Sequence, residues 1–223
     1  MARHGPITIA FLLFEGFTAL DVVGPYDVLS RVPGATVRLV AVDAGPATDG
    51  VGAMTVAPSA TLDETPRPNV VVVPGGEGVL AACSDTRILR WLCEVHETSL
   101  FTTSVCTGAL LLGAASLLRG RRATTHWLSL PDLASYGAQP VVARVVTDGK
   151  IITAAGVSAG IDMALQLASR LADERTAQAI QLSLEYAPDP PFDAGSPDTA
   201  PAAVTTLVRR AAARRRTSAP SQQ

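Results

Sequence analysis

Cys106 is the residue of this sequence best placed to do chemistry. It stands where a strand-like apolar run, residues 100–105, meets a helical pattern over residues 106–118. A residue at such a junction must turn sharply, which in α/β enzymes exposes a nucleophile above the edge of the sheet. The start of the helix favours a thiolate over a thiol, and its free N–H groups can stabilise an anion on a substrate. A buried structural cysteine is the alternative, and this segment alone does not decide between them.

A carboxylate and a glycine-rich turn follow two other strand-like runs. Asp21 lies in the apolar stretch 20–23, and apolar surroundings raise the pKa of a carboxyl group so that it can hold or pass a proton. Helix N-capping is the alternative role for Asp21. The turn 74–78, Pro-Gly-Gly-Glu-Gly, lets backbone approach a ligand and offers N–H donors, although a simple tight turn has the same composition.

His126 is the histidine whose position suits a site. Activation of a cysteine by histidine needs the two side chains within hydrogen-bond reach. The residue directly after Cys106 is Thr107, not histidine, so His126 has to come from a distant part of the chain. A structural or pocket-lining role for His126 is the favoured interpretation.

The elements that must position these residues alternate along the chain, which predicts βα units around a largely parallel sheet. Strands are expected at residues 7–13, 36–42, 54–58, 69–73, 100–105, 141–146 and 150–154. Helices are expected at residues 22–32, 85–96, 106–118, 158–171 and 175–186. Because a parallel sheet binds ligands at the carboxyl ends of its strands, Asp21, the turn 74–78 and Cys106 are expected at one edge.

The domain organisation follows from composition along the chain. One α/β domain is expected over residues 1–200, with a proline-rich connector at 187–199. Residues 201–223 are expected to form an amphipathic helix and basic tail, packed on or trailing the same domain. Without the last fifteen residues, 13 basic side chains face 20 acidic ones, which argues against a nucleic-acid partner.

Overall composition bounds the class of protein. With 223 residues, 48% of them hydrophobic and 17% charged, the chain can bury a substantial core. Its three cysteines, Cys83, Cys93 and Cys106, are odd in number and form no C-x-x-C pair, which argues against a disulfide framework or a thiolate metal site. No apolar run reaches the roughly 18 residues of a membrane span, and residues 1–6 lack a secretory signal. We expect a cytoplasmic protein with no membrane partner.

The sequence resembles the ThiJ/PfpI superfamily, and within it the bacterial isocyanide hydratases, over nearly its whole length. The resemblance is carried by the segments Phe11–Phe14, Leu20–Leu29, Pro74–Val79, Thr103–Gly108, Arg122–Trp127, Ala159–Asp162 and Leu184–Pro201. It implies a flavodoxin-like three-layer sandwich with a mainly parallel sheet and a cysteine at a nucleophile elbow. It also implies a homodimer that hydrates isocyanides to N-formamides with water alone, without a cofactor or a metal.

The resemblance assigns roles residue by residue. Cys106 matches the nucleophile that forms a thioimidate, and Asp21 matches the acid/base, an aspartate where many superfamily members have glutamate. The backbone at Gly76 and Thr107 match groups that stabilise the thiolate and the developing charge. Val157 matches an apolar residue, commonly isoleucine, that packs beside the nucleophile. The peptidase branch of the superfamily has histidine after the cysteine, so Thr107 argues against that branch.

Two other functions stay open from the sequence. A glyoxalase or deglycase of the same superfamily would use Cys106 on α-oxoaldehydes. A ligand or redox sensor without catalysis is the second, because AraC-type regulators carry a related domain. Those regulators add a helix-turn-helix part, for which this sequence is not expected to have a counterpart.

Overall fold

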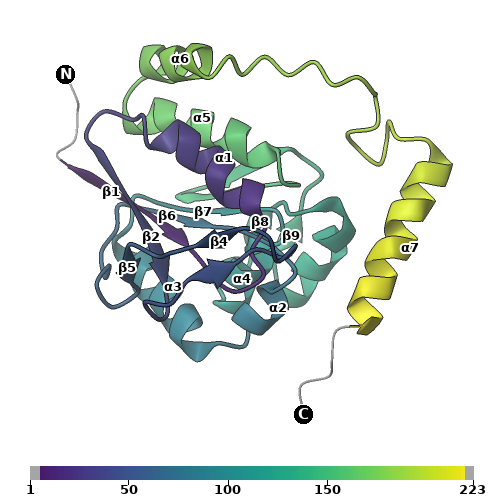
Figure 1. The fold of residues 1–223 in the computed structure, drawn as a ribbon, viewed down its shortest axis with the longest axis horizontal. Helices are drawn as coiled ribbons and strands as arrows, with labels where there is room; N and C mark the ends of the chain where they lie inside the picture. Colours follow the sequence, from purple (N-terminus) through teal and green to yellow (C-terminus); the bar gives the residue numbers. More distant parts are fainter. Residues whose placement is uncertain (1–5, 219–223) are drawn as a thin grey trace. The chain divides into compact units, whose positions relative to one another are not determined.

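A seven-stranded sheet carries the residues singled out above (Figure 1). A computed structural model describes residues 6–218 and divides the chain between Glu185 and Tyr186 into two compact units. The sheet belongs to the first unit and has the strand order β10 (Val145–Asp148), β11 (Ile151–Ala154), β7 (Phe101–Val105), β6 (Val70–Val73), β1 (Ile7–Leu12), β2 (Ala35–Ala41), β5 (Ala60–Thr61). All neighbouring strands are parallel except the hairpin β10–β11.

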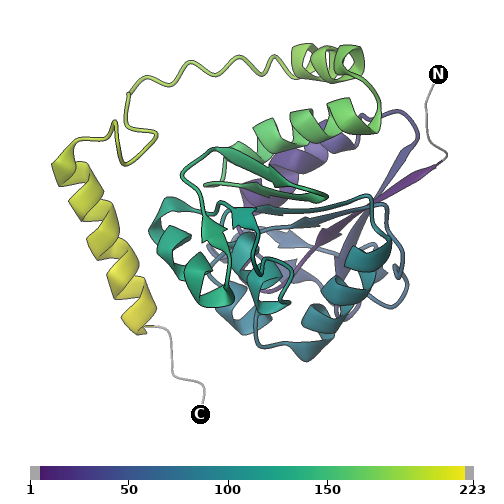
Figure 2. The same cartoon turned by 180° about the vertical axis from the view of Figure 1, so that it is seen from behind.

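Helices cover both faces of this sheet, as the two opposite views show (Figures 1 and 2). One face carries α1 (Ala19–Leu29), α5 (Ala159–Leu171) and α6 (Glu174–Ser183). The other carries α2 (Val79–Ala82), α3 (Thr86–Thr98) and α4 (Gly108–Ala114). The predicted flavodoxin-like three-layer sandwich with a mainly parallel sheet is therefore confirmed.

The core follows from the hydrophobic pattern of the central elements. The four valines of β6 are fully buried, as a parallel strand covered on both faces requires. On α5 the buried side chains recur with the helical period, and they include Met163, Leu167 and Leu171. The alternation of apolar runs and amphipathic helices thus produces the layers directly.

Several short elements complete the first unit. A hairpin of β3 (Ala47–Thr48) and β4 (Thr55–Val56) agrees with the short hairpin strand expected at 54–58. A parallel pair of β8 (Arg122–Ala123) and β9 (Gln139–Pro140) encloses the 3₁₀ helix η1 (Trp127–Tyr136), neither of which was predicted. The helix expected over 106–118 is too long, because α4 ends at Ala114 and Ser116 turns the chain with a φ of +62°.

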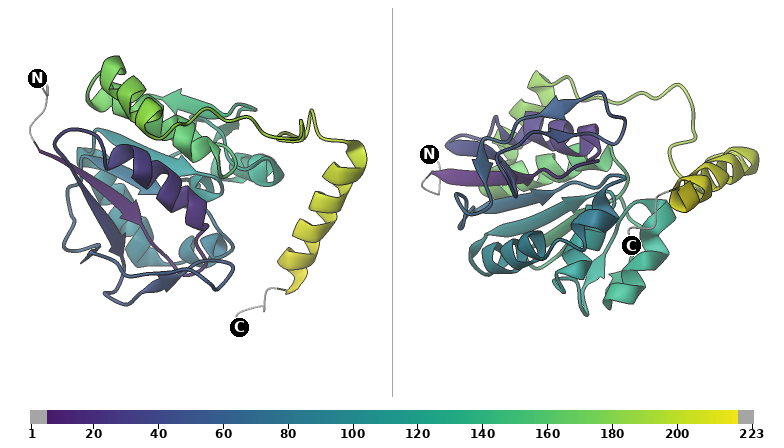
Figure 3. Two further views of the ribbon diagram at one scale, coloured as in Figure 1. Left: turned by 45° about the horizontal axis from the view of Figure 1, so that its top comes forward. Right: turned by 60° about the horizontal axis from the view of Figure 1, so that its bottom comes forward.

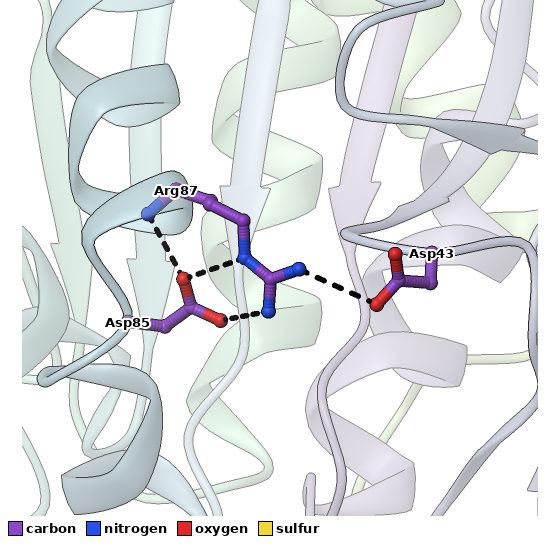
Figure 4. Close-up of polar contacts among 3 residues, drawn as sticks. All are labelled: Asp43, Asp85 and Arg87. Carbon is purple, nitrogen blue, oxygen red and sulfur yellow. Dashed lines mark hydrogen bonds and ion pairs between the residues drawn. The ribbon is translucent and has the colours of Figure 1, made fainter.

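The start of α3 is tied to the turn that follows β2 (Figure 4). Asp85 is the N-cap of α3 and accepts a hydrogen bond from the backbone N–H of Arg87 at 2.9 Å. The Arg87 guanidinium also forms ion pairs with the Asp85 carboxylate at 2.8 Å and with the Asp43 carboxylate at 3.5 Å. Because Arg87 and Asp43 are exposed, this cluster orients the two segments more than it stabilises them.

The second unit consists of a connector without helix or strand up to residue 201, followed by α7 (Ala202–Ser218) (Figure 3). The predicted connector and terminal helix are present, while the packing expected for residues 201–223 stays a prediction. The end of the basic tail, 219–223, and the segment 1–5 lie outside the described residues. Within residues 6–218 no helix is long and apolar enough to cross a membrane, and no three metal-ligating side chains cluster.

Candidate active site

Cys106 forms the sharp turn that the sequence predicts. It lies between β7 and α4 with a φ of +55°, a left-handed conformation that costs a non-glycine residue about 1–3 kcal/mol. Its N–H donates to the carbonyls of Ala154 at 3.1 Å and Ala155 at 2.9 Å. Its own carbonyl accepts a hydrogen bond from Thr125 Oγ1 at 2.6 Å. The surrounding backbone therefore holds the strained turn, and the side chain is only 6% exposed.

Asp21 is the carboxylate that faces this turn. It lies in the first turn of α1 and is fully buried, and its Oδ2 accepts the N–H of Gly75 at 2.8 Å. Among the described residues no partner of regular hydrogen-bond geometry reaches Oδ1, but the Cys106 thiol lies close enough to lower the pKa of Asp21. The N-cap of α1 is Thr18, so the capping role considered for Asp21 is wrong.

Burial dominates the electrostatics of this pair. It raises the pKa of Asp21 to about 7, against hydrogen bonds from Gly75 and Cys106 that lower it. Burial, and then the negative charge of Asp21, raise the pKa of Cys106 to about 12. The thiolate expected from the helix start is therefore not favoured, because desolvation outweighs the N–H groups of Val157 and Thr107. Because the pKa of the Cys106 thiol is about 12, the pair retains at least one proton at neutral pH.

The glycine-rich turn packs directly against the start of α4. The N–H of Gly76 donates to Thr107 Oγ1 at 3.0 Å, and the N–H and hydroxyl of Thr107 lie close enough to the Cys106 thiol to lower its pKa. A Cβ added at Gly75 would lie 2.4 Å from Thr107 Oγ1, which explains the glycine there. Gly76 thus reaches the sulfur through the Thr107 hydroxyl.

Val157 and His126 reach the site differently. The backbone N–H of Val157 lies close enough to the Cys106 thiol to lower its pKa, while the Val157 side chain is partly buried against the core. His126 is half-buried, accepts the N–H of Leu128 at 3.3 Å as the cap of η1, and has its pKa lowered by burial. Its Cδ2 lies 3.0 Å from the position of a Cβ on Gly156, so it borders the Val157 loop. The described contacts of His126 do not include the Cys106 thiol, which agrees with a structural or lining role.

Sequence reasoning missed Thr125, whose hydroxyl holds the Cys106 carbonyl. It also missed the backbone contribution of Val157, since only a side-chain role was expected. The sole signal for Thr125 was its place between Thr124 and His126 in a segment that had drawn attention for the histidine.

Two surface hollows lie away from these residues. One, of about 430 Å³, lies beside α6 and is lined by Arg31, Arg175 and Ile180, among others. The second, of about 580 Å³, is lined by Cys83, Arg119 and Tyr136, among others. Neither hollow is lined by Cys106 or Asp21. Cys106 is closely covered in the single chain, since it is only 6% exposed.

Comparison with known proteins identifies the family. Residues 7–170 match the model of the DJ-1/PfpI family. The chain belongs to the DJ-1/PfpI family. An isonitrile hydratase from Pseudomonas putida is 48% identical over 207 residues, which are 93% of this chain and 90% of that protein. The crystal structure of a ThiJ/PfpI family protein from Pseudomonas syringae matches with a TM-score of 0.91 and 42% identity, over 94% of this chain and 87% of that one.

A transcriptional regulator is also similar to part of this chain. The HTH-type transcriptional regulator CdhR from Pseudomonas aeruginosa is 28% identical over 79% of this chain, and the match covers 53% of the length of CdhR. The family model and the 48% identical relative confirm the predicted ThiJ/PfpI membership, and the matches of this chain include both an enzyme and a regulator. Function has to be argued from the site.

Proposed function

We propose that this protein hydrates isocyanides, R–N≡C, to N-formamides, R–NH–CHO. The main support is that the chain is 48% identical, over 93% of its length, to an isonitrile hydratase. Isonitrile is another name for isocyanide. The geometry supports this activity, because a buried thiol at a strained turn faces a buried carboxyl group whose pKa lies near neutrality. The reaction consumes only water, so no cofactor or metal enters the proposal.

In the first half of the reaction, the sulfur of Cys106 and one proton are added to the isocyanide carbon, and Asp21 transfers the proton. The sulfur forms a bond to that carbon while the thiol proton passes to Asp21. Asp21 then gives the proton to the same carbon, whose lone pair accepts it, and the product is the thioimidate Cys–S–CH=N–R. A pKa of about 7 allows Asp21 to accept and release the proton at neutral pH.

In the second half, water replaces the sulfur. Asp21 takes a proton from water as the water oxygen bonds to the thioimidate carbon, and Asp21 then gives that proton to the nitrogen, which leaves Asp21 ionised again. The C–S bond of the resulting tetrahedral adduct then breaks, the hydroxyl proton returns to sulfur through Asp21, and R–NH–CHO leaves. Hydrogen bonds from Thr107 and the Val157 N–H stabilise the negative sulfur when it attacks and when it leaves.

Formamide production tests this proposal directly. Purified protein is incubated with an alkyl or aryl isocyanide, and the formamide is quantified by NMR. The Cys106→Ala variant should lose turnover while keeping the melting temperature, since it removes only the sulfur atom and leaves the packing of the surrounding residues unchanged. Consumption of methylglyoxal without formamide would instead support a glyoxalase or deglycase. A Cys106→Ala protein that keeps its cellular role would support the sensor function. The similarity to the regulator CdhR is the reason to test this alternative.

The proposal includes a cytoplasmic homodimer as the working form. The three cysteines are free thiols, which fits a reducing compartment. Leu20 and Tyr26 are each 40% exposed on α1, the helix that carries Asp21, and a second copy could cover them. Sedimentation of the purified protein should give twice the mass of the chain, and a monomer that is active would remove the dimer from the proposal.

A further inference from the structure

The loop between β11 and α5, residues 155–158, supplies one of the N–H groups at the sulfur. Its start is anchored to the elbow, because the Cys106 N–H donates to the carbonyls of Ala154 and Ala155. Two residues further on, the Val157 N–H lies close enough to the Cys106 thiol to lower its pKa. The direction of that N–H therefore depends on how the rest of the loop is held.

Arg144, which directly precedes β10, holds both ends of this loop. Its backbone carbonyl accepts the N–H of Ala155 at 2.9 Å. Its guanidinium Nη2 donates to Ser158 Oγ at 3.3 Å, and Nε donates to the Asp162 carboxylate. Asp162 lies in the first turn of α5, where a negative charge also complements the helix dipole. One residue thus fixes the loop at its first position, its last position and the helix that follows.

The exposure of this ion pair limits what else it can do. The side chain of Arg144 is 52% exposed and that of Asp162 is 28% exposed. Ion pairs of this kind contribute little to stability, because water screens them and the side chains lose entropy. A planar guanidinium that engages two partners nevertheless imposes geometry. Positional control of the loop is therefore the larger effect.

We propose that Arg144, through Ser158 and Asp162, is a positioning residue that directs the Val157 N–H at the sulfur of Cys106. The inference rests on the proposed function in one respect, namely that Cys106 is the nucleophile. Loss of Arg144 should then impair the chemistry of the sulfur while leaving binding of the substrate and the stability of the fold nearly unchanged.

The test compares Arg144→Ala and Arg144→Lys with a matched control, Arg170→Ala. Arg170 lies on α5 and its Nη2 donates to Thr147 Oγ1 of β10 at 3.1 Å, so it joins the same elements away from the loop. The rate of Cys106 alkylation by iodoacetamide is followed against pH by peptide mass spectrometry. Asp21 and His126 border the site in every variant, and Arg170→Ala removes a positive charge as Arg144→Ala does, so differences between these two profiles report the loop contacts of Arg144. kcat, KM and the melting temperature are measured alongside.

For Arg144→Ala we expect alkylation of Cys106 to slow at each pH and kcat to fall about tenfold, the low end for a hydrogen bond to a charged group. KM should stay within about twofold, Arg144→Lys should recover part of the loss, and Arg170→Ala should match the parent. A parental alkylation profile in Arg144→Ala, or an equal loss in Arg170→Ala, overturns the inference. If Arg144→Ala does not fold, Ser158→Ala and Arg144→Lys decide it by the same profile. A parent that makes no formamide overturns the proposed function, whereas the alkylation profiles decide the positioning role alone.

Discussion

Replacing Asp21 with asparagine should make the protein more stable and nearly inactive. Asparagine keeps the size of the side chain and can still accept the Gly75 N–H, now 2.8 Å from Oδ2. It removes the ionisable group that faces Cys106. Because Asp21 is fully buried, its charge is poorly solvated, and the asparagine variant escapes that cost.

The magnitude follows from the pKa. The carboxyl group titrates near 3.8 in the unfolded chain and at about 7 in the folded protein. Between these values the folded state holds a proton that the unfolded state has lost, so stability falls as the pH rises through this range. At about 1.4 kcal/mol per pKa unit, the loss reaches about 4 kcal/mol above pH 7. Asparagine does not titrate, so its advantage over the parent should grow from near zero at pH 4 to about this value.

Urea unfolding from pH 4 to pH 8 measures this difference, followed by tryptophan fluorescence of the buried Trp91. Asp49→Asn is the control without a pH trend. The pKa of Asp49 is lowered, chiefly by the N–H of Met54, so its carboxylate is ionised in the folded and the unfolded state above about pH 5. The stability difference between Asp49→Asn and the parent should therefore stay nearly constant from there to pH 8. Formamide production by Asp21→Asn should fall at least about a hundredfold, the low end of general acid–base contributions. A stability difference independent of pH refutes the raised pKa, and a parental rate refutes the acid/base role.

Three further substitutions test the packing of the site. Thr107→Val leaves the Gly76 N–H without its acceptor. We expect the free energy of unfolding, measured by urea titration, to fall by about 1–3 kcal/mol, and kcat in the formamide assay to fall at least about tenfold. Gly75→Ala places a Cβ 2.4 Å from Thr107 Oγ1, so activity and about 1–3 kcal/mol of stability should be lost, and a parental melting temperature would contradict this packing. Ser104→Ala removes a buried hydroxyl that has no partner among the described residues, which should raise stability by about 1 kcal/mol without changing kcat, and a lower melting temperature would contradict it.

The meeting of Asp21, the turn 74–78 and Cys106 could be predicted from sequence because it depends on topology. Each follows a strand of one parallel sheet, and carboxyl ends of parallel strands share an edge. The elbow itself was visible as a strand that passes into a helix without a loop. Its left-handed φ confirms that interpretation.

The state of the thiol could not be predicted, because it depends on how deeply the pair is buried. The helix start alone favours a thiolate, but burial and Asp21 outweigh it. Contacts between distant segments could not be predicted either. Examples are the hydrogen bond from the Gly76 N–H to Thr107 and the one from the Arg144 guanidinium to Ser158. The 3₁₀ helix η1 was missed since its apolar residues, including Leu130 and Leu133, follow neither a strand nor a regular α-helical period.

Mass spectrometry of Cys106 during turnover tests the central claim most directly. Protein and excess isocyanide are mixed, quenched with acid at short times and digested. The proposed thioimidate contains the whole isocyanide, so the peptide with Cys106 should gain the full mass of the substrate and lose it as formamide accumulates. Formamide production without any adduct on Cys106, or with the adduct on Cys83 or Cys93 instead, would contradict covalent hydration at this cysteine.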